Sequence, residues 1–348
     1  MTSSEVTYAS AGVDIEAGDE AVRRITSVVA STHRKGVLGG IGGFGGMFEL
    51  DLERYSAPVL VAATDGVGTK LAVAKETGRL STVGIDLVAM CVDDLVCCGA
   101  EPLFLLDYVA VAQLNPAELE QLVIGVAEGC RQAGVALLGG ETAEHADTMA
   151  AGDFDLAGFA VGVVEKHHRS DASLVTSTDV LIGLPSPGLR SNGYTLARHV
   201  LLERAQLPLD GPAWEGATTT LADELLRPSV IYTKPVVEAL RAHPGKIHAI
   251  AHITGGGIAG NLVRVLPADV DAVVDLSAIP RPQIFNEIAR LGPVAEEEMA
   301  RVFNLGLGMV LAVDLASAAH VIETLGRAGQ EAVIVGTLKA GTKTVEVK

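Results

Sequence analysis

The sequence predicts a two-domain protein of the α/β (α+β) class. Its 348 residues exceed what one small hydrophobic core can organise, so two domains are expected. Hydrophobic residues make up 49% of the chain but aromatic residues only 4%, which indicates cores of aliphatic side chains. Strand and helix patterns alternate along the chain, which favours layers of sheet and helix. The charged segment 165–171 is typical of a domain linker, and we place the domains at 1–168 and 169–348.

Hydrophobic periodicity places the elements of the first domain. Apolar residues recur at helical spacing in 16–31 and 84–98, and in the second of these Asp86, Asp93 and Asp94 fall off the apolar face, which favours a solvated surface for them. The run 58–63 (PVLVAA) predicts a buried strand that brings Asp65 to its carboxyl end. We expect further helices from about Thr69 and over 116–134, and further strands over 102–111, 135–138 and 154–164.

The second domain repeats this alternation. A strand is expected at 180–184, one helix after Ser191-Asn192-Gly193 and another after Thr254-Gly255-Gly256-Gly257, followed by strand, helix and strand to the end. No short-period repeat is present, which excludes a solenoid.

Charge and composition limit the partners. The chain carries 26 basic and 43 acidic residues, a net charge of −17, so it repels nucleic acid. Charge or glycine interrupts every apolar stretch before it could span a bilayer, and the N-terminus carries no secretory signal. We therefore expect a cytoplasmic enzyme that acts on a small molecule. The four cysteines form no CxxC pair, and we expect reduced, mostly buried thiols.

The segment 64–70 (TDGVGTK) carries the strongest chemical signal. It places Asp65, Gly66, Gly68, Thr69 and Lys70 between a strand end and a helix start, where an anion and a metal can both be held. The hydroxyl precedes the lysine, which excludes a P-loop, since that motif needs Gly-Lys-Ser/Thr. On the motif alone, Asp65 as a helix cap and Lys70 as a surface charge remain an equal alternative.

Two further carboxylates are candidates for the same site. Asp94 on the expected 84–98 helix could join Asp65 in holding Mg²⁺, which commonly takes one or two protein carboxylates with phosphate and water oxygens. Glu141 in 139–144 (GGETAE) follows a strand, where α/β sheets gather ligands, and is a third candidate as metal ligand or base. Each residue taken singly is more often an exposed acid.

Three glycine-rich segments could bind phosphate groups. Small residues at Ser191–Gly193 and Thr254–Gly257 open helices and leave backbone N–H groups free, although ordinary helix caps look the same. The loop Gly42-Gly43-Phe44-Gly45-Gly46 could close over a nucleotide or be a flexible connector.

These segments, in this order, resemble the AIR synthetase (phosphoribosylformylglycinamidine cyclo-ligase) family over nearly the whole chain. GIDLVAMCVDDL (84–95) and AGVDI (11–15) are specific to the cyclo-ligases. TDGVGTK (64–70) and the glycine-rich arm are shared with a wider ATP-binding superfamily that includes FGAM synthetase and selenophosphate synthetase. The resemblance implies an N-terminal sheet that pairs across a dimer axis and a C-terminal α/β domain.

The resemblance also implies an activity and a site. The reaction would convert formylglycinamidine ribonucleotide (FGAM) and ATP to aminoimidazole ribonucleotide (AIR), ADP and phosphate, in a homodimer that uses Mg²⁺. Catalytic groups carry over to Asp65, Lys70, Asp94 and Glu141, and metal ligands to Asp65, Asp94 and Glu141. The ATP site would comprise Gly42, Gly43, Phe44, Gly45, Gly46, Asp65, Gly66, Gly68, Thr69 and Lys70. Substrate phosphate would contact Arg190, Ser191, Asn192, Gly193, Thr254, Gly255, Gly256 and Gly257.

The chain departs from the family pattern at three places. His145-Ala146-Asp147 stands where many relatives have Met-Pro-Gly, Arg190 where many have His, and Asp93 where Asn is frequent. An acid or base role of that His cannot transfer, but Arg190 could bind phosphate bidentately.

Two alternatives remain. One is a sister ATP-dependent enzyme of the superfamily, and the other is a nucleotide-binding regulator without catalysis. Joint presence of Asp65, Lys70 and Asp94 argues against the regulator, because a decayed site has no reason to keep them together.

Overall fold

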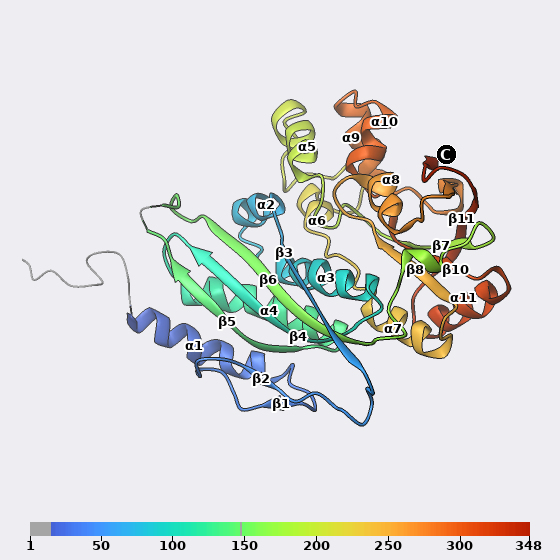
Figure 1. Ribbon diagram of the computed structural model, residues 1–348. Helices are drawn as coiled ribbons and strands as arrows, with labels where there is room; N and C mark the ends of the chain where they lie inside the picture. Colours follow the sequence, from blue (N-terminus) through green and yellow to red (C-terminus); the bar gives the residue numbers. More distant parts are fainter. Residues whose placement is uncertain (1–14, 147) are drawn as a thin grey trace, which may run out of the picture.

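The protein consists of two main sheets with helices packed between and around them, as a computed structural model shows (Figure 1). The structure describes residues 15–146 and 148–348. Residues 11–14 of the AGVDI segment and Asp147 lie outside the described residues. Both sheets mix parallel and antiparallel pairing, in agreement with the expected α/β (α+β) class.

The N-terminal sheet has four strands in the order β3-β6-β4-β5. β3 pairs antiparallel to β6, β6 antiparallel to β4, and β4 parallel to β5. A small hairpin, β1-β2, carries the glycine-rich loop between its strands. The strands are β1 (Val37–Leu38), β2 (Met47–Phe48), β3 (Pro58–Gly66), β4 (Glu101–Val111), β5 (Ala136–Glu144) and β6 (Phe154–Glu165), and the helices are α1 (Ile15–Ala30), α2 (Lys70–Thr77), α3 (Ser81–Cys97) and α4 (Pro116–Ala133).

Local sequence signals fix the helix that follows β4. The side chain of Asn115 caps α4 by accepting a hydrogen bond from the Ala117 amide at 3.1 Å, and Pro116 occupies the first turn, where no amide hydrogen is needed. Gly134 ends the helix at φ 75°, a left-handed conformation that glycine adopts without strain. This agrees with the expected helix over 116–134.

The C-terminal sheet has six strands in the order β12-β9-β11-β7-β10-β8, with antiparallel neighbours except for the parallel pair β12 and β9. Its strands are β7 (Val180–Pro185), β8 (Ile247–His252), β9 (Val270–Val274), β10 (Leu307–Val313), β11 (Val333–Ala340) and β12 (Val345–Val347). Its helices are α5 (Tyr194–Arg198), α6 (Leu221–Leu225), α7 (Thr233–Ala242), α8 (Gly257–Leu262), α9 (Gln283–Leu291), α10 (Glu296–Val302) and α11 (Ala318–Arg327).

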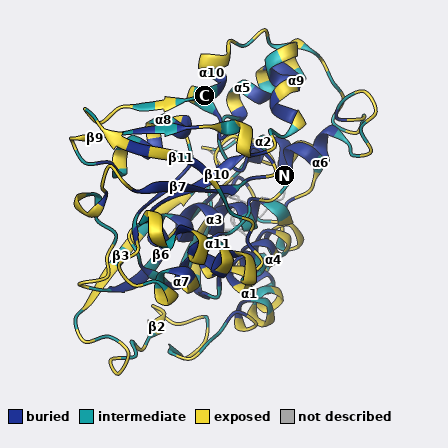
Figure 2. Ribbon diagram, turned by 90° about the vertical axis from the view of Figure 1, so that its right-hand side faces the viewer, coloured by how far each residue is buried: buried dark blue, intermediate teal, exposed yellow. Residues whose placement is uncertain are grey.

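Helix α3 lies at the centre of the molecule, between the two sheets (Figures 1 and 2). It packs on β3 and β6 on one side and on β8 and α7 on the other. Asp86 and Asp93 are therefore fully buried, and the prediction that they lie on a solvated helix surface is wrong. The periodicity located the apolar face of α3 correctly, but the C-terminal domain covers the opposite face of this helix.

The strand predictions need two further corrections. β3 is an edge strand whose Val59 and Leu60 are exposed, so the expectation of a buried strand is wrong. β5 continues to Glu144, because β4 pairs with it as far as Val111, so GGETAE is part of the strand that was expected to end at residue 138. Glycines at 139 and 140 weaken a strand but do not prevent the pairing.

The cysteines and the helices bear on two further expectations, reduced thiols and the absence of a membrane span. Cys91 and Cys130 are buried, Cys97 is partly buried, Cys98 is exposed, and all four are free thiols. Within residues 15–146 and 148–348, no helix combines the length and apolar character needed to cross a bilayer.

Candidate active site

Asp65 lies at the carboxyl end of β3, at the surface between the two domains. Its Oδ1 accepts a hydrogen bond from the Gly66 amide at 2.7 Å, which orients the carboxylate. Desolvation raises the pKa of Asp65, and the negative charge of Asp94 adds to that rise, while the Gly66 amide opposes it. The structure thus places Asp65 and Asp94 near each other, and their joint binding of a metal stays a prediction.

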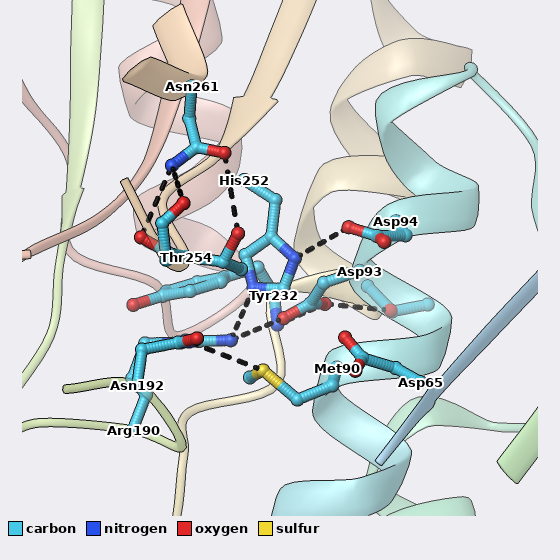
Figure 3. Close-up of polar contacts among 12 residues, drawn as sticks. Asp65, Met90, Asp93, Asp94, Arg190, Asn192, Tyr232, His252, Thr254 and Asn261 are labelled. Carbon is cyan, nitrogen blue, oxygen red and sulfur yellow. Dashed lines mark hydrogen bonds and ion pairs between the residues drawn. The ribbon is translucent and has the colours of Figure 1, made fainter. Parts of the chain in front are cut away.

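Asp94 lies on α3 with its side chain 47% exposed. Its Oδ1 is 2.9 Å from Nδ1 of His252, the last residue of β8, whose side chain is only 2% exposed. Figure 3 shows the Asp94 carboxylate of α3 joined to the His252 ring beside it, with Asp65 near them on the neighbouring strand. The cluster therefore takes residues from β3, α3 and β8, and it joins the two domains.

The donor set of this cluster fits Mg²⁺. Magnesium in nucleotide sites is held by one or two carboxylates together with phosphate and water oxygens, and Asp65 and Asp94 supply two carboxylates near solvent. Across the part of the chain that the structure describes, no group of three or more His, Cys, Asp or Glu side chains could hold a metal without such help. The pair suits a metal that arrives bound to a nucleotide.

Glu141 does not join this pair in the single chain. It lies on β5, across the sheet from β3, with β4 and β6 between them. Glu141 pairs with Tyr108, Tyr108 with Ala157, and Ala157 with Gly66, so about 14 Å separates it from the end of β3 at a strand spacing of about 4.8 Å. The expectation that one metal binds Asp65, Asp94 and Glu141 together is corrected here.

Lys70 lies inside the protein instead of facing a nucleotide. Its ammonium group is 0% exposed and forms an ion pair with Asp86 at 2.5 Å. It also donates to the backbone carbonyls of Arg190 at 3.1 Å and Arg227 at 2.8 Å. Burial lowers the pKa of Lys70, while Asp86 opposes that shift. A fully buried Lys70 cannot reach a nucleotide phosphate, so that prediction is corrected, and Lys70 instead ties α2 to the second domain.

Asp65, Gly66, Gly68 and Thr69 of the TDGVGTK segment remain near the surface, while Val67 is buried. Gly68 has φ 70°, a conformation that favours glycine, and it turns the chain from β3 into α2. The Thr69 hydroxyl is 3.3 Å from the Thr195 hydroxyl of α5, so this segment touches the second domain. Gly66 and Gly68 are thus placed beside Asp65 as predicted, although Lys70 is not.

The glycine-rich loop covers a separate cavity of about 960 Å³. Gly42–Gly46, α1 and the end of β5 line this cavity, and Glu141 is among the lining residues. Gly46 approaches β5 so closely that a Cβ there would overlap the Leu138 side chain. The loop therefore lies over Glu141 and apart from Asp65 and Asp94.

Asp107 in the same cavity is a candidate that the sequence did not reveal. It lies on β4, and desolvation raises its pKa to about 7. Gly140 on the neighbouring strand leaves room for its carboxyl group, since a Cβ there would overlap Asp107. An acid inside an expected strand gives no signal in periodicity, which explains the omission.

The two predicted phosphate-binding segments lie side by side. A Cβ added to Gly255 would be 3.5 Å from Oδ1 of Asn192, so Ser191–Gly193 and Thr254–Gly257 form one surface. Gly193 and Gly256 both have positive φ and open α5 and α8 respectively. Asn261 shapes the second segment, because its side-chain amide donates to the carbonyls of Thr254, Gly255 and Gly257. Sequence reasoning missed Asn261, which looks like an ordinary helix residue.

Arg190 does not belong to this phosphate-binding surface. Its guanidinium group is 1% exposed, donates to Asp93 at 3.1 Å, and lies 4.9 Å from the centre of the Tyr232 ring. A group so enclosed cannot grip a substrate phosphate, so that prediction is corrected. Two of the three departures from the family pattern, Arg190 and Asp93, are in contact with each other.

Comparisons with known proteins show the family to which the chain belongs. The family models "AIR synthase related protein", N-terminal domain and C-terminal domain, match residues 53–164 and 177–348. The chain is 52% identical over 335 residues to a phosphoribosylformylglycinamidine cyclo-ligase of Myxococcus xanthus, covering 96% of each chain. It is 47% identical over 334 residues to the protein of the same name from Bacillus cereus, again covering 96% of each.

Solved structures support the fold at lower identity. Thiamine-monophosphate kinase from Stenotrophomonas maltophilia has a TM-score of 0.69 at 20% identity, covering 94% of this chain and 96% of that one. The hydrogenase maturation protein HypE in complex with ATP has a TM-score of 0.64 at 17% identity, covering 93% and 90%. At sequence identities this low, the structural similarity shows only that the folds are alike.

Proposed function

Because the chain belongs to the AIR synthase related family, we infer that it catalyses the ATP-dependent cyclisation of FGAM to AIR in purine biosynthesis. ADP and phosphate are the other products, and the enzyme is a ligase that forms a C–N bond. One observation from the structure carries the proposal. The carboxylate pair Asp65 and Asp94 lies at the domain junction, where α3 meets β8, and β8 leads into the Thr254–Gly257 segment.

The chemistry requires activation of a poor leaving group. Transfer of the γ-phosphoryl group of ATP to the formamide oxygen of FGAM gives an iminophosphate, and attack by a nitrogen of the same substrate closes the five-membered ring with loss of phosphate. Phosphoryl transfer of this kind depends mainly on positioning and on neutralising charge. The protein therefore has to hold two anionic molecules in contact and exclude water.

Each part of the site has a task in this scheme. Asp65 and Asp94 would hold Mg²⁺ with the ATP phosphates, and the bound cation supplies positive charge at the transferring phosphoryl group. Ser191–Gly193 and Thr254–Gly257 would bind the ribose phosphate of FGAM through backbone N–H groups at the starts of α5 and α8. Gly42–Gly46 lies above the cavity that Glu141 and Asp107 line, so it would have to move toward Asp65 and Asp94 to close over the bound nucleotide.

The assay that tests this function measures both products. Purified protein with ATP, Mg²⁺ and FGAM is expected to form a diazotisable aminoimidazole and ADP in equal amounts. In the cell, we propose that this reaction takes place in the cytoplasm. ADP release without the aminoimidazole would instead indicate a sister enzyme, and nucleotide binding without turnover would indicate a regulator.

We also propose that the enzyme is a homodimer formed through the N-terminal sheet. Leu60, Tyr108 and Phe159 are exposed on one face of this sheet. Gly158 points to the other face of the sheet, and that face is covered by Leu87 and Cys91 of α3. An uncovered apolar sheet face next to the free edge of β3 is typical of an interface.

The dimer is tested by its mass in solution. Analytical ultracentrifugation of the wild-type chain at micromolar concentration is expected to give twice the chain mass of 35.9 kDa. Leu60→Asp, which places a charge on the apolar face, is expected to shift the protein to monomer. A monomeric wild-type protein under these conditions would contradict the proposal.

A further inference from the structure

The buried guanidinium group of Arg190 determines which atoms of its neighbours can carry a proton. Its Nη1 donates to the Val230 carbonyl at 2.9 Å. Its Nη2 lies 3.1 Å from Oδ2 of Asp93 and 2.8 Å from Nε2 of His252. Arginine has five N–H donors, no acceptor, and stays charged at all accessible pH values. Each partner must therefore accept a hydrogen bond.

This requirement decides the tautomer of His252. Nε2 can accept from Arg190 only as an unprotonated nitrogen, so the neutral ring carries its proton on Nδ1. Nδ1 is 2.9 Å from Oδ1 of Asp94, and Nδ1–H donates to that oxygen. The opposite tautomer would point an N–H at the guanidinium and would leave Asp94 without a donor.

Asp93 keeps Arg190 in the position from which it fixes the tautomer of His252. Its Oδ1 accepts from the Tyr232 amide and the Thr233 hydroxyl, both at 3.0 Å, while Oδ2 accepts from Arg190. Desolvation raises the pKa of Asp93, and the charge of the Arg190 guanidinium group opposes that rise. Asp93 is fully buried, and therefore it serves as an anchor and not as a metal ligand.

We propose that Arg190 and His252 are positioning residues for Asp94. Arg190 holds His252 in the Nδ1–H tautomer, and His252 binds one Asp94 oxygen (Figure 3). The other Asp94 oxygen would then be available to a cation beside Asp65. The part that concerns the cation rests on the proposed function. Only Ile253 separates His252 from Thr254–Gly257, so His252 links the phosphate segment to the carboxylate pair.

The tautomer itself is tested by ¹⁵N NMR on the full-length, ligand-free protein at mildly alkaline pH. Long-range ¹H–¹⁵N correlations distinguish protonated from unprotonated ring nitrogens, and His252→Gln identifies the signal. We expect a protonated Nδ1 and an unprotonated Nε2. A protonated Nε2 would overturn the proposal, whatever reaction the enzyme catalyses.

To test the role of Arg190, a variant is needed that leaves no buried charge unpaired. Arg190→Met combined with Asp93→Asn removes both members of the ion pair together, so the fold should survive. In this double variant the His252 signals are expected to shift toward a mixture of tautomers. Unchanged signals would show that Arg190 does not fix the tautomer.

The consequence for Asp94 is tested by the Mg²⁺ dependence of ADP binding, measured by calorimetry. His252→Ala removes the donor, and it is expected to weaken the Mg²⁺-dependent binding about 10–100-fold, a usual effect of losing a partner of a metal ligand. His252→Asn places an amide donor near the Nδ1 position and should recover part of the loss. Equal binding by both variants and the wild type would overturn the positioning role, even if thermal stability fell.

Discussion

Asp94→Ala is expected to lower kcat/KM for AIR formation by at least about 10²-fold, because it removes half of the carboxylate pair that faces the ATP phosphates. The side chain is 47% exposed, so the free energy of unfolding should change by no more than about 1 kcal/mol. Initial rates of aminoimidazole formation and a thermal melt of the same preparation measure the two effects.

Two controls separate charge from bulk in this experiment. Asp94→Asn keeps the size of the side chain and an oxygen for the His252 bond but removes the negative charge, so it should be nearly as inactive as the alanine variant. Glu297→Ala removes an exposed acid on α10 and should leave the rate unchanged. Activity of Asp94→Ala within a factor of a few of wild type would refute the assignment of Asp94.

Lys70→Met is expected to destabilise the protein by about 3–5 kcal/mol. The substitution leaves the carboxylate of Asp86 in the interior without its cation, and breaking one side of a buried ion pair carries a penalty of this size. Chemical denaturation read by circular dichroism gives the change in the unfolding free energy.

A double variant shows whether the penalty comes from the unpaired charge. Lys70→Met with Asp86→Asn removes both charges, and the asparagine oxygen can still accept from the amide and hydroxyl of Ser229. We expect this variant to recover at least half of the lost stability. A single Lys70→Met variant as stable as wild type would show that Lys70 is not a structural cation.

Local signals in the sequence predicted the elements of the fold that depend on neighbours along the chain. The cap at Asn115, the proline after it and Gly134 define α4 within one residue. The TDGVGTK segment placed Asp65 at a strand end, and periodicity located α3. These features follow from backbone preferences and one apolar face, which a single sequence contains.

The features that were missed depend on what packs against an element from elsewhere. Asp86 and Asp93 looked like surface charges, and Lys70 like a nucleotide contact or a surface charge. The partners that cover them, Ser229, Arg190 and their neighbours, come from the other domain. Glu141 looked close to Asp65 because both follow apolar runs, but strand order and not strand sequence decides their separation. Only a known pairing of strands could have corrected this.

The position of the bound metal tests the central claim most directly. Crystals of the enzyme with Mn²⁺ in place of Mg²⁺ and a non-hydrolysable ATP analogue would show the metal by anomalous scattering. The predicted peak lies within bonding distance of the carboxylates of Asp65 and Asp94, beside the phosphates of the nucleotide. A peak elsewhere, such as at Glu141 beneath the glycine loop with neither aspartate near it, would contradict the account.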